Sequence, residues 1–324
     1  MPATDTTSSS SIIDAIKMAS SYLASHQIKS PRLHAELLLG HIVKCSRIEL
    51  YLKFDQPLVS AELESYNTSL ARHAEGEPVQ YIIGTTEFFS LPFEVTPAVL
   101  IPRPETEALV DMAHDYLSLL THEATEVAVE SYDGQCDLIE LSRKVKKSAN
   151  GNVLDIGVGS GVIALTLAHL NPLISVYGTE ISSEAVMIAE RNRESLALTD
   201  RVQFLEGTCC APLQGRGLEA SFDLIVSNPP YIRTSEISNL PVEIKKFEPV
   251  LALDGGGDGL RWYRQIALES KSYLGLGARL MVEIGADQAS DVTKILKAEG
   301  IFSEITVKKD YNGLDRVISA QRGQ

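Results

Sequence analysis

One short segment of the sequence combines residue types that could bind a planar NH2 group. The sequence Ser-Asn-Pro-Pro-Tyr occupies residues 227–231 and directly follows the apolar run 224–226. Two consecutive prolines stiffen the backbone and remove N–H donors, which leaves carbonyl groups available as acceptors. Asn228 adds a side-chain acceptor, and Tyr231 adds a flat face. The segment predicts an acceptor-lined pocket for an amide or an exocyclic amine, with a rigid loop that binds nothing as the plainer interpretation.

The nitrogen of such a group is a poor nucleophile because its lone pair is delocalised. Accepting hydrogen bonds from its N–H groups can orient and enrich it, and near-attack alignment lowers the barrier further. No strong base is required if the other reactant is a reactive sulfonium methyl donor. We expect Asn228, Pro229 and Tyr231 to be catalytic, and Asn228, Pro229, Pro230 and Tyr231 to bind the substrate.

A second segment predicts a site for a nucleotide-like cofactor. The sequence Gly-Val-Gly-Ser-Gly at residues 157–161 follows the apolar run 153–156 and precedes a helical pattern, so the backbone can approach a ligand closely. A tight turn without a ligand is the other interpretation. Val162 stands where the dinucleotide fingerprint has its third glycine, which disfavours a nicotinamide cofactor.

Polar residues at the ends of the next two strands extend this cofactor site. Glu180 ends a strand-like run, where a carboxylate can accept hydrogen bonds from both ribose hydroxyls of a nucleoside. Thr208 and Cys209 follow the next run and could meet an adenine edge or simply pack. The expected cofactor-binding residues are Asp155, Gly157, Val158, Gly159, Ser160, Gly161, Glu180, Thr208, Cys209 and Asn228.

The elements that must position these residues alternate between strand and helix. Strand patterns cover residues 153–156, 174–178, 202–205 and 222–226, with helices after Ser160 and Ser183. Such alternation predicts a parallel sheet, whose carboxyl edge would collect both motifs. Beyond it we expect a helix after Asp258, a strand at 280–284, a helix after Gln288, and two strands joined by the Asn-Gly turn at 312–313 as an antiparallel hairpin.

The first part of the chain has a different pattern. Ser11 and Asp14 predict a capping box, Ser30 an N-cap before Pro31, and helical periodicity continues to about Glu75. Aromatic and β-branched residues at 81–99 predict a hairpin-like linker. It ends in a stretch with two prolines before a helix that starts near Pro104. Residues 122–150 are polar without a clear period and are interpreted as an insertion.

The composition excludes several classes of protein. The 29 Lys and Arg against 43 Asp and Glu give a net charge of -14, which disfavours general binding to nucleic acid. The four cysteines lack paired metal spacing and the density of a disulfide framework, so we expect a reducing cytoplasm and no metal. No apolar stretch is long enough to span a bilayer, and residues 1–11 do not have the pattern of a signal peptide.

Several segments together resemble a known family. They are residues 77–84, residues 100–107, the glycine run, residues 228–231, and Phe-Glu-Pro at 247–249 followed by 255–260. In combination they resemble the HemK/PrmC release-factor glutamine methyltransferases over nearly the whole chain. Two residues depart from the family pattern, because Glu180 replaces the more usual Asp and Thr208 stands where Asp is general.

The resemblance implies an α/β fold: a class I, Rossmann-like methyltransferase with a seven-stranded sheet whose last pair is antiparallel, plus a small all-α N-terminal domain. We expect a substrate-recognition domain at 1–79, a hairpin linker at 80–103 and a methyltransferase domain at 104–324. The implied cofactor is S-adenosyl-L-methionine, with S-adenosyl-L-homocysteine as product. The implied substrate is the glutamine N5 of the Gly-Gly-Gln motif in peptide chain release factors.

Two rival functions remain at this stage. The same loop occurs in amino-methyltransferases that act on adenine or cytosine rotated out of a nucleic acid, and the loop alone does not separate the two substrates. The charge and the lack of an evident basic recognition domain favour a protein substrate. A non-catalytic binding module is the other rival, and intact Asn228 and Tyr231 argue against it. We expect a cytoplasmic monomer without direct nucleic-acid or membrane contacts.

Overall fold

The computed structural model describes residues 10–130 and 151–323. Its contacts divide the chain into two compact units. The first comprises Met1–Thr85 with Pro241–Phe247, and the second comprises Thr86–Leu240 with Glu248–Gln324. The short helix α10 (Val242–Phe247) thus groups with the N-terminal unit, although the sequence had suggested that it belongs to the later domain.

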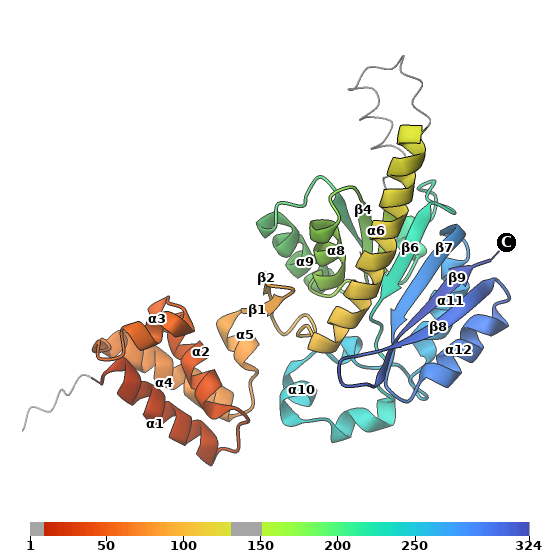
Figure 1. The fold of residues 1–324 in the computed structure, drawn as a ribbon. Helices are drawn as coiled ribbons and strands as arrows, with labels where there is room; N and C mark the ends of the chain where they lie inside the picture. Colours follow the sequence, from red (N-terminus) through yellow and green to blue (C-terminus); the bar gives the residue numbers. More distant parts are fainter. Residues whose placement is uncertain (1–9, 131–150, 324) are drawn as a thin grey trace, which may run out of the picture. The chain divides into compact units, whose positions relative to one another are not determined.

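The first unit is helical (Figure 1). Its further helices are α1 (Ile12–Ser25), α2 (Pro31–Val43), α3 (Arg47–Leu52), α4 (Ser60–Ala74) and α5 (Val79–Ile83). Their apolar faces meet in one core that contains the fully buried Leu23 and Leu39 and the almost fully buried Tyr66. The Ser11 side chain accepts a hydrogen bond from the Asp14 backbone N–H, as the capping pattern predicts.

One local prediction for this unit was partly confirmed, and another was wrong. Ser30 is the N-cap residue of α2, as predicted, but its backbone is left-handed with φ of 52° and its side chain makes no capping hydrogen bond. Pro31 supplies the favourable helix start. Residues 80–83, expected in the hairpin linker, instead belong to helix α5, which ends because Gly84 adopts φ of 83°.

The second unit is built on a seven-stranded sheet in the order β5-β4-β3-β6-β7-β9-β8. The strands are β3 (Asn152–Ile156), β4 (Ser175–Glu180), β5 (Val202–Glu206), β6 (Phe222–Ser227), β7 (Leu274–Glu283), β8 (Phe302–Lys309) and β9 (Asp315–Arg322). The pairs from β5 to β7 are parallel. Strand β9 is antiparallel to both β7 and β8, which confirms the reversed strand expected from the Asn-Gly turn.

Helices cover both faces of this sheet (Figure 1). Helices α6 (Glu107–Glu130), α8 (Val162–Leu170) and α9 (Ser183–Ser195) cover one face, and α11 (Arg261–Ser270) and α12 (Ala289–Ala298) cover the other. Neighbouring strand residues point to opposite faces, so Val153 joins the core under α8 whereas Leu154 joins the core under α11. The core therefore has two layers that hold the strand ends rigidly.

Two segments outside the sheet bear on the site. Strands β1 (Thr85–Phe88) and β2 (Leu91–Glu94) form a two-stranded hairpin, and the backbone N–H of Glu94 donates to Asn192 Oδ1 on α9 at 2.7 Å. Helix α6 continues through residues 122–130, which were interpreted as part of an insertion. That stretch contains neither Pro nor Gly, so nothing in it stops a helix. The remainder, 131–150, lies outside the described residues.

Among the described residues, no helix combines the length and the apolar character needed to cross a bilayer.

Candidate active site

A cavity of about 340 Å³ lies at the carboxyl edge of the parallel strands, within the second unit. Its walls come from the segments that follow four strands, together with the loop that leads into α6. Ligands of open α/β sheets bind at this edge. The wall includes Arg103, Thr106, Gly157, Val158, Gly159, Ser160, Glu180, Cys209, Asn228, Pro229 and Pro230.

The glycine loop presents bare backbone to the cavity. Gly157 and Gly159 have φ of 80° and 56°, and a Cβ atom added to either would meet no heavy atom within 4 Å. The open space in front of these two glycines is thus on the cavity side, where a ligand can approach the main chain. The backbone N–H of Gly157 donates to the carbonyl of Thr179 at 2.8 Å, which ties the loop to the end of β4.

Glu180 closes the neighbouring wall. Its side chain is 9% exposed, and its two carboxylate oxygens accept backbone hydrogen bonds from Gly159 at 2.9 Å and from Ser182 at 3.0 Å. A carboxylate has about four acceptor positions, so two positions remain for hydroxyl groups of a ligand. The residue therefore shapes the loop and offers acceptors to the cavity.

Asp155 and Gly161 lie behind the loop and not in the cavity wall. One Asp155 oxygen accepts from the backbone N–H of Ala164 at 3.1 Å, and the other has no partner among the described residues. Full burial raises the pKa of Asp155 to about 7. A Cβ atom at Gly161 would stand 2.8 Å from Leu165, so the turn into α8 leaves no room for a side chain there.

Of the two residues expected near an adenine edge, one lines the cavity. Cys209 contributes to the wall and has a left-handed backbone with φ of 48°. Thr208 is half-buried and lies outside the wall, where its carbonyl accepts from the backbone of Ala211. The family generally has Asp at this position, and in this chain the Thr208 that stands there lies outside the cavity wall.

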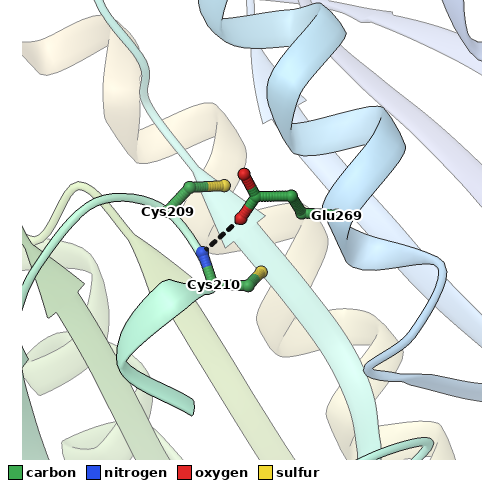
Figure 2. A group of neighbouring side chains, drawn as sticks. All are labelled: Cys209, Cys210 and Glu269. Atoms are coloured by element: carbon green, nitrogen blue, oxygen red, sulfur yellow. Dashed lines mark hydrogen bonds between the residues drawn. The ribbon is translucent and has the colours of Figure 1, made fainter. Parts of the chain in front are cut away.

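The buried Cys209 and Cys210 and the half-buried Glu269 form a cluster (Figure 2). In the part of the chain that the structure describes, their possible ligand atoms lie within 4.8 Å of one another. The Glu269 carboxylate is already engaged, since it accepts from the Cys210 backbone N–H at 2.9 Å and from Gln265 at 2.9 Å. Hydrogen bonding with Cys210 and burial raise the pKa of the Cys209 thiol, which disfavours a metal-binding thiolate. Our expectation that the protein holds no metal stays a prediction.

The Asn-Pro-Pro segment, which follows the neighbouring strand β6, forms another part of the wall of the same cavity. Ser227 anchors it, because its hydroxyl donates to the carbonyl of Ile156 at 2.6 Å. The Asn228 side-chain nitrogen donates to the Thr106 hydroxyl at 3.1 Å, which leaves the side-chain oxygen of Asn228 as its acceptor end. Asn228 thus shares one cavity with Gly157 and Glu180.

Tyr231 is placed differently from the rest of its motif. It does not line the cavity, and its ring packs against the core under α11. Burial, with a smaller effect from Glu283, raises its pKa to about 12. Its carbonyl accepts from the side chain of Gln288 at 3.1 Å. These contacts hold the end of the loop in place, so the geometry gives Tyr231 a structural contribution beside the catalytic one that we predict.

Comparison with known proteins shows which family the chain belongs to. Residues 14–84 match the PrmC N-terminal domain, and residues 137–245 match the methyltransferase small domain. The release factor glutamine methyltransferase of Geobacter sulfurreducens is 40% identical over 302 residues, which cover 93% of each chain. That of Chlorobaculum tepidum is 35% identical over 95% of this chain and 96% of its own. The chain belongs to the release factor glutamine methyltransferase family. It is therefore an S-adenosylmethionine-dependent methyltransferase.

The fold of this methyltransferase is also found in a more distant solved structure. The hMettl16 catalytic domain in complex with MAT2A 3'UTR hairpin 1 is similar, with a TM-score of 0.52 and 15% identity over 93% of this chain and 90% of that one. At this identity the likeness concerns the fold alone. The prediction of a class I methyltransferase with a seven-stranded sheet and a small helical N-terminal region is confirmed.

The cavity of this methyltransferase fits S-adenosylmethionine. The open backbone at Gly157 and Gly159 suits close contact with an extended ligand, and Glu180 offers acceptors to ribose hydroxyls. Asn228 lines the same cavity. The residues present are thus of the types that this cofactor requires.

Sequence reasoning missed several residues of the methyltransferase site. Thr106 and Arg103 come from the loop before α6, and Arg103 forms a 2.5 Å ion pair with the buried Glu248. Glu283, at the end of β7, is 1% exposed and lies close to this network. The signal for Arg103, Thr106 and Glu248 was present, because residues 100–107 and 247–249 carried part of the family resemblance. No pattern marked Glu283.

Proposed function

We propose that this protein methylates the side-chain amide nitrogen, N5, of the glutamine in the Gly-Gly-Gln motif of peptide chain release factors. S-Adenosylmethionine is the methyl donor. The observation that carries the proposal is that Asn228 and the glycine loop face one cavity in a chain of this family. The relatives from Geobacter sulfurreducens and Chlorobaculum tepidum are named release factor glutamine methyltransferases, which supports a glutamine of a release factor as the substrate.

The acceptor wall would bind the amide through its hydrogens. The Asn228 oxygen accepts one N–H of the glutamine amide, and the Pro229 carbonyl accepts the other. Pro229 and Pro230 have no N–H, so no donor competes with the amide at this wall. Accepting both hydrogens holds the NH2 plane and directs the nitrogen lone pair towards the methyl group.

The donor supplies an electrophilic methyl group on a sulfonium. The glutamine nitrogen forms a bond to that carbon while the carbon–sulfur bond breaks, and one amide proton is released to solvent. The Asn228 oxygen disperses the charge that develops on the attacking N–H group. The chain thus contributes orientation and electrostatic stabilisation, and the cofactor contributes the reactive bond.

For the donor, we propose contacts from residues 157–160, Glu180 and Cys209, all of which line the cavity. Asp155 and Gly161 support the loop from behind. For the protein substrate, we propose that the helical unit, residues 1–79, recognises the release factor and that residues 104–324 carry out the transfer. We also propose that the enzyme acts as a monomer in the cytoplasm, without metal.

The test is a methylation assay with purified protein, the donor and a release factor. Mass spectrometry of the peptide that contains the Gly-Gly-Gln loop should show one added methyl group on the glutamine. A release factor with that glutamine replaced by asparagine is the matched control and should stay unmodified. Transfer to DNA or RNA oligonucleotides with no transfer to the release factor would overturn the proposal.

A further inference from the structure

Two buried residues, Thr106 and Glu283, lie beside Asn228, and of the two only Thr106 contributes to the cavity wall. Strands β6 and β7 are parallel, and Ser227 pairs with Val282, so the next residues, Asn228 and Glu283, leave the sheet side by side. The backbone carbonyl of Glu283 accepts from the Tyr263 hydroxyl at 3.0 Å, which fixes the end of β7. A carboxyl group is thereby held at the rear of the acceptor wall.

Thr106 lies between these two side chains. It is 2% exposed, and its hydroxyl accepts from the Asn228 side-chain nitrogen at 3.1 Å. Burial raises the pKa of Glu283 to about 7, and hydrogen bonding from Thr106 opposes that rise. A hydroxyl has one hydrogen and two lone pairs. A Thr106 hydroxyl that donates to Glu283 is therefore left with lone pairs for Asn228.

The orientation of the Asn228 amide decides what the cavity presents. The oxygen and nitrogen ends of an Asn side chain have nearly the same shape, so packing alone does not choose between them. With the oxygen towards the cavity, the side chain accepts from a substrate NH2 group. With the nitrogen towards the cavity, two donors would face each other and the substrate would lose a hydrogen bond.

We propose that Thr106 and Glu283 are positioning residues that hold the Asn228 side-chain oxygen towards the substrate amide. This inference rests on the proposed function for the identity of the substrate, although the orientation itself is a property of the protein. Glu283 accepts a hydrogen bond from Thr106, and Thr106 accepts one from the side-chain nitrogen of Asn228. This order of donors and acceptors leaves the side-chain oxygen of Asn228 for the cavity. One oxygen of Glu283 has no hydrogen-bond partner among the described residues, so its carboxyl group keeps a free acceptor position.

The charges around Glu283 are compatible with this direction. Arg316, on β9, and Arg103, in the loop before α6, both lower the pKa of Glu283, whereas Glu105 raises it. The two cations oppose the larger effect of burial, which leaves the pKa of Glu283 at about 7. Above that pH the group is mainly a carboxylate, which can only accept hydrogen bonds. A carboxylate therefore orients Thr106 in one way, whereas a protonated carboxyl group could also donate to it.

The kinetic test compares Thr106→Val with Thr106→Ser in the full-length protein. Valine keeps the shape and removes the hydroxyl, so kcat should fall roughly 10- to 100-fold while KM for the donor changes less than about 3-fold. Serine keeps the hydroxyl and should retain kcat within about 3-fold. The kcat of Glu283→Gln should lie between those of the valine and serine variants, because the amide of the introduced glutamine can either accept a hydrogen bond from Thr106 or donate one to it. Equal losses in the valine and serine variants would overturn the proposal.

A matched control is available in α8. Thr166 is fully buried, and its hydroxyl has no partner among the described residues. Thr166→Val removes the same group without breaking a hydrogen bond, so its kcat should equal that of the wild type. A loss in Thr166→Val as large as in Thr106→Val would mean that the cores of these variants are generally disturbed, and the positioning role would fail.

A second measurement needs no substrate. Solvent exchange of the Asn228 side-chain NH2 is followed by NMR, with the resonance identified by its loss in Asn228→Asp. Exchange should be several-fold faster in Thr106→Val than in the wild type and unchanged in Thr106→Ser and Thr166→Val. Equal exchange in all variants would overturn the positioning role. Faster exchange in Thr106→Val, with a wild type that methylates no release factor, would uphold the orientation and reject the proposed function.

Discussion

The two halves of the cavity are built in different ways. The cofactor half, residues 157–160 with Glu180, is held by contacts within one strand-helix-strand unit: Gly159 with Glu180, 21 residues later, and Glu180 with Ser182, two residues later. The acceptor half, residues 227–231, is held by partners far along the chain. Thr106 lies 122 residues before Asn228. The geometry of the cofactor half is therefore set within one strand-helix-strand unit. The geometry of the acceptor half depends on contacts between segments that are far apart in the sequence.

Because the two halves are built differently, substitutions in them should affect different quantities, donor binding in one case and turnover in the other. Damage to the cofactor half should weaken donor binding, because its backbone N–H groups and carboxylate are the proposed donor contacts. Damage to the acceptor half should lower turnover, because its acceptors act on the amide during transfer. Asn228→Ala and Glu180→Gln are each expected to change one of these quantities and to spare the other.

The largest effect is expected for Asn228→Ala. The substitution removes the side-chain acceptor, and loss of one such electrostatic contact lowers kcat by roughly 10²- to 10³-fold. The Kd of S-adenosylhomocysteine, measured by calorimetry, should change less than about 5-fold because the glycine loop and Glu180 remain. Single-turnover kinetics with the release factor measure the first quantity. Equal losses in binding and turnover would show that Asn228 mainly supports the structure. That result would contradict the separate roles of the two halves of the cavity.

The contrast also explains what the sequence could predict. Val153 and Leu154 alternate between the two core layers, and the strand runs at 174–178 and 222–226 lie within one or two residues of their observed bounds. The glycine loop and Glu180 were found because turn chemistry and strand ends are local patterns. Helix α6 was cut short in the prediction because the sequence of residues 122–130 has no clear apolar period.

The rest of the site depends on tertiary contacts that no local pattern records. Glu283 reaches the site because β7 pairs with β6, and sequence spacing alone does not give that neighbour. Asp155 was expected to contact the cofactor, but its carboxylate turns back to the start of α8. Tyr231 was expected at the cavity, but its ring packs into the core. Which face a side chain takes is decided by packing.

The second prediction concerns the cofactor half. Glu180→Gln replaces a carboxylate that accepts from Gly159 with an amide that has one acceptor end, so the Kd of S-adenosylhomocysteine should rise about 10-fold. The kcat at saturating donor should stay within about 3-fold. Glu184→Gln is the matched control, because Glu184 also lines the cavity but is exposed, and its Kd should not change. An unchanged Kd in Glu180→Gln would remove Glu180 from the donor contacts.

The third prediction concerns stability in the same half. The pKa of Asp155 is about 7 in the folded protein against an ordinary value of 3.8, so the folded state holds this proton more tightly than the unfolded chain does. As pH rises from about 4 to about 7, the unfolded chain loses the proton first, and the free energy of unfolding falls. Asp155→Asn has no such proton. Its Tm should therefore decrease less than that of the wild type between about pH 5 and about pH 8, by several degrees in calorimetry.

Parallel pH dependence in the two proteins would contradict the effect of burial on Asp155. Glu283 is a second buried acid with a pKa of about 7, and it is unchanged in Asp155→Asn. The difference between the two Tm curves therefore isolates Asp155. Since Asp155 stands behind the glycine loop, the Kd of S-adenosylhomocysteine should move little at a pH where both proteins are folded.

The smallest effect is expected for Thr208→Asp, which restores the residue general in the family. Thr208 is half-buried and lies outside the cavity wall, whereas its neighbour Cys209 is within it. A new carboxylate at position 208 would lie beside the cavity, so the Kd of S-adenosylhomocysteine should change less than about 3-fold. Calorimetry on Thr208→Asp and the wild type measures this change. A tenfold tighter Kd would mean that the loop turns position 208 towards the adenine when ligand binds, and the cofactor half would then be less preformed than its local contacts suggest.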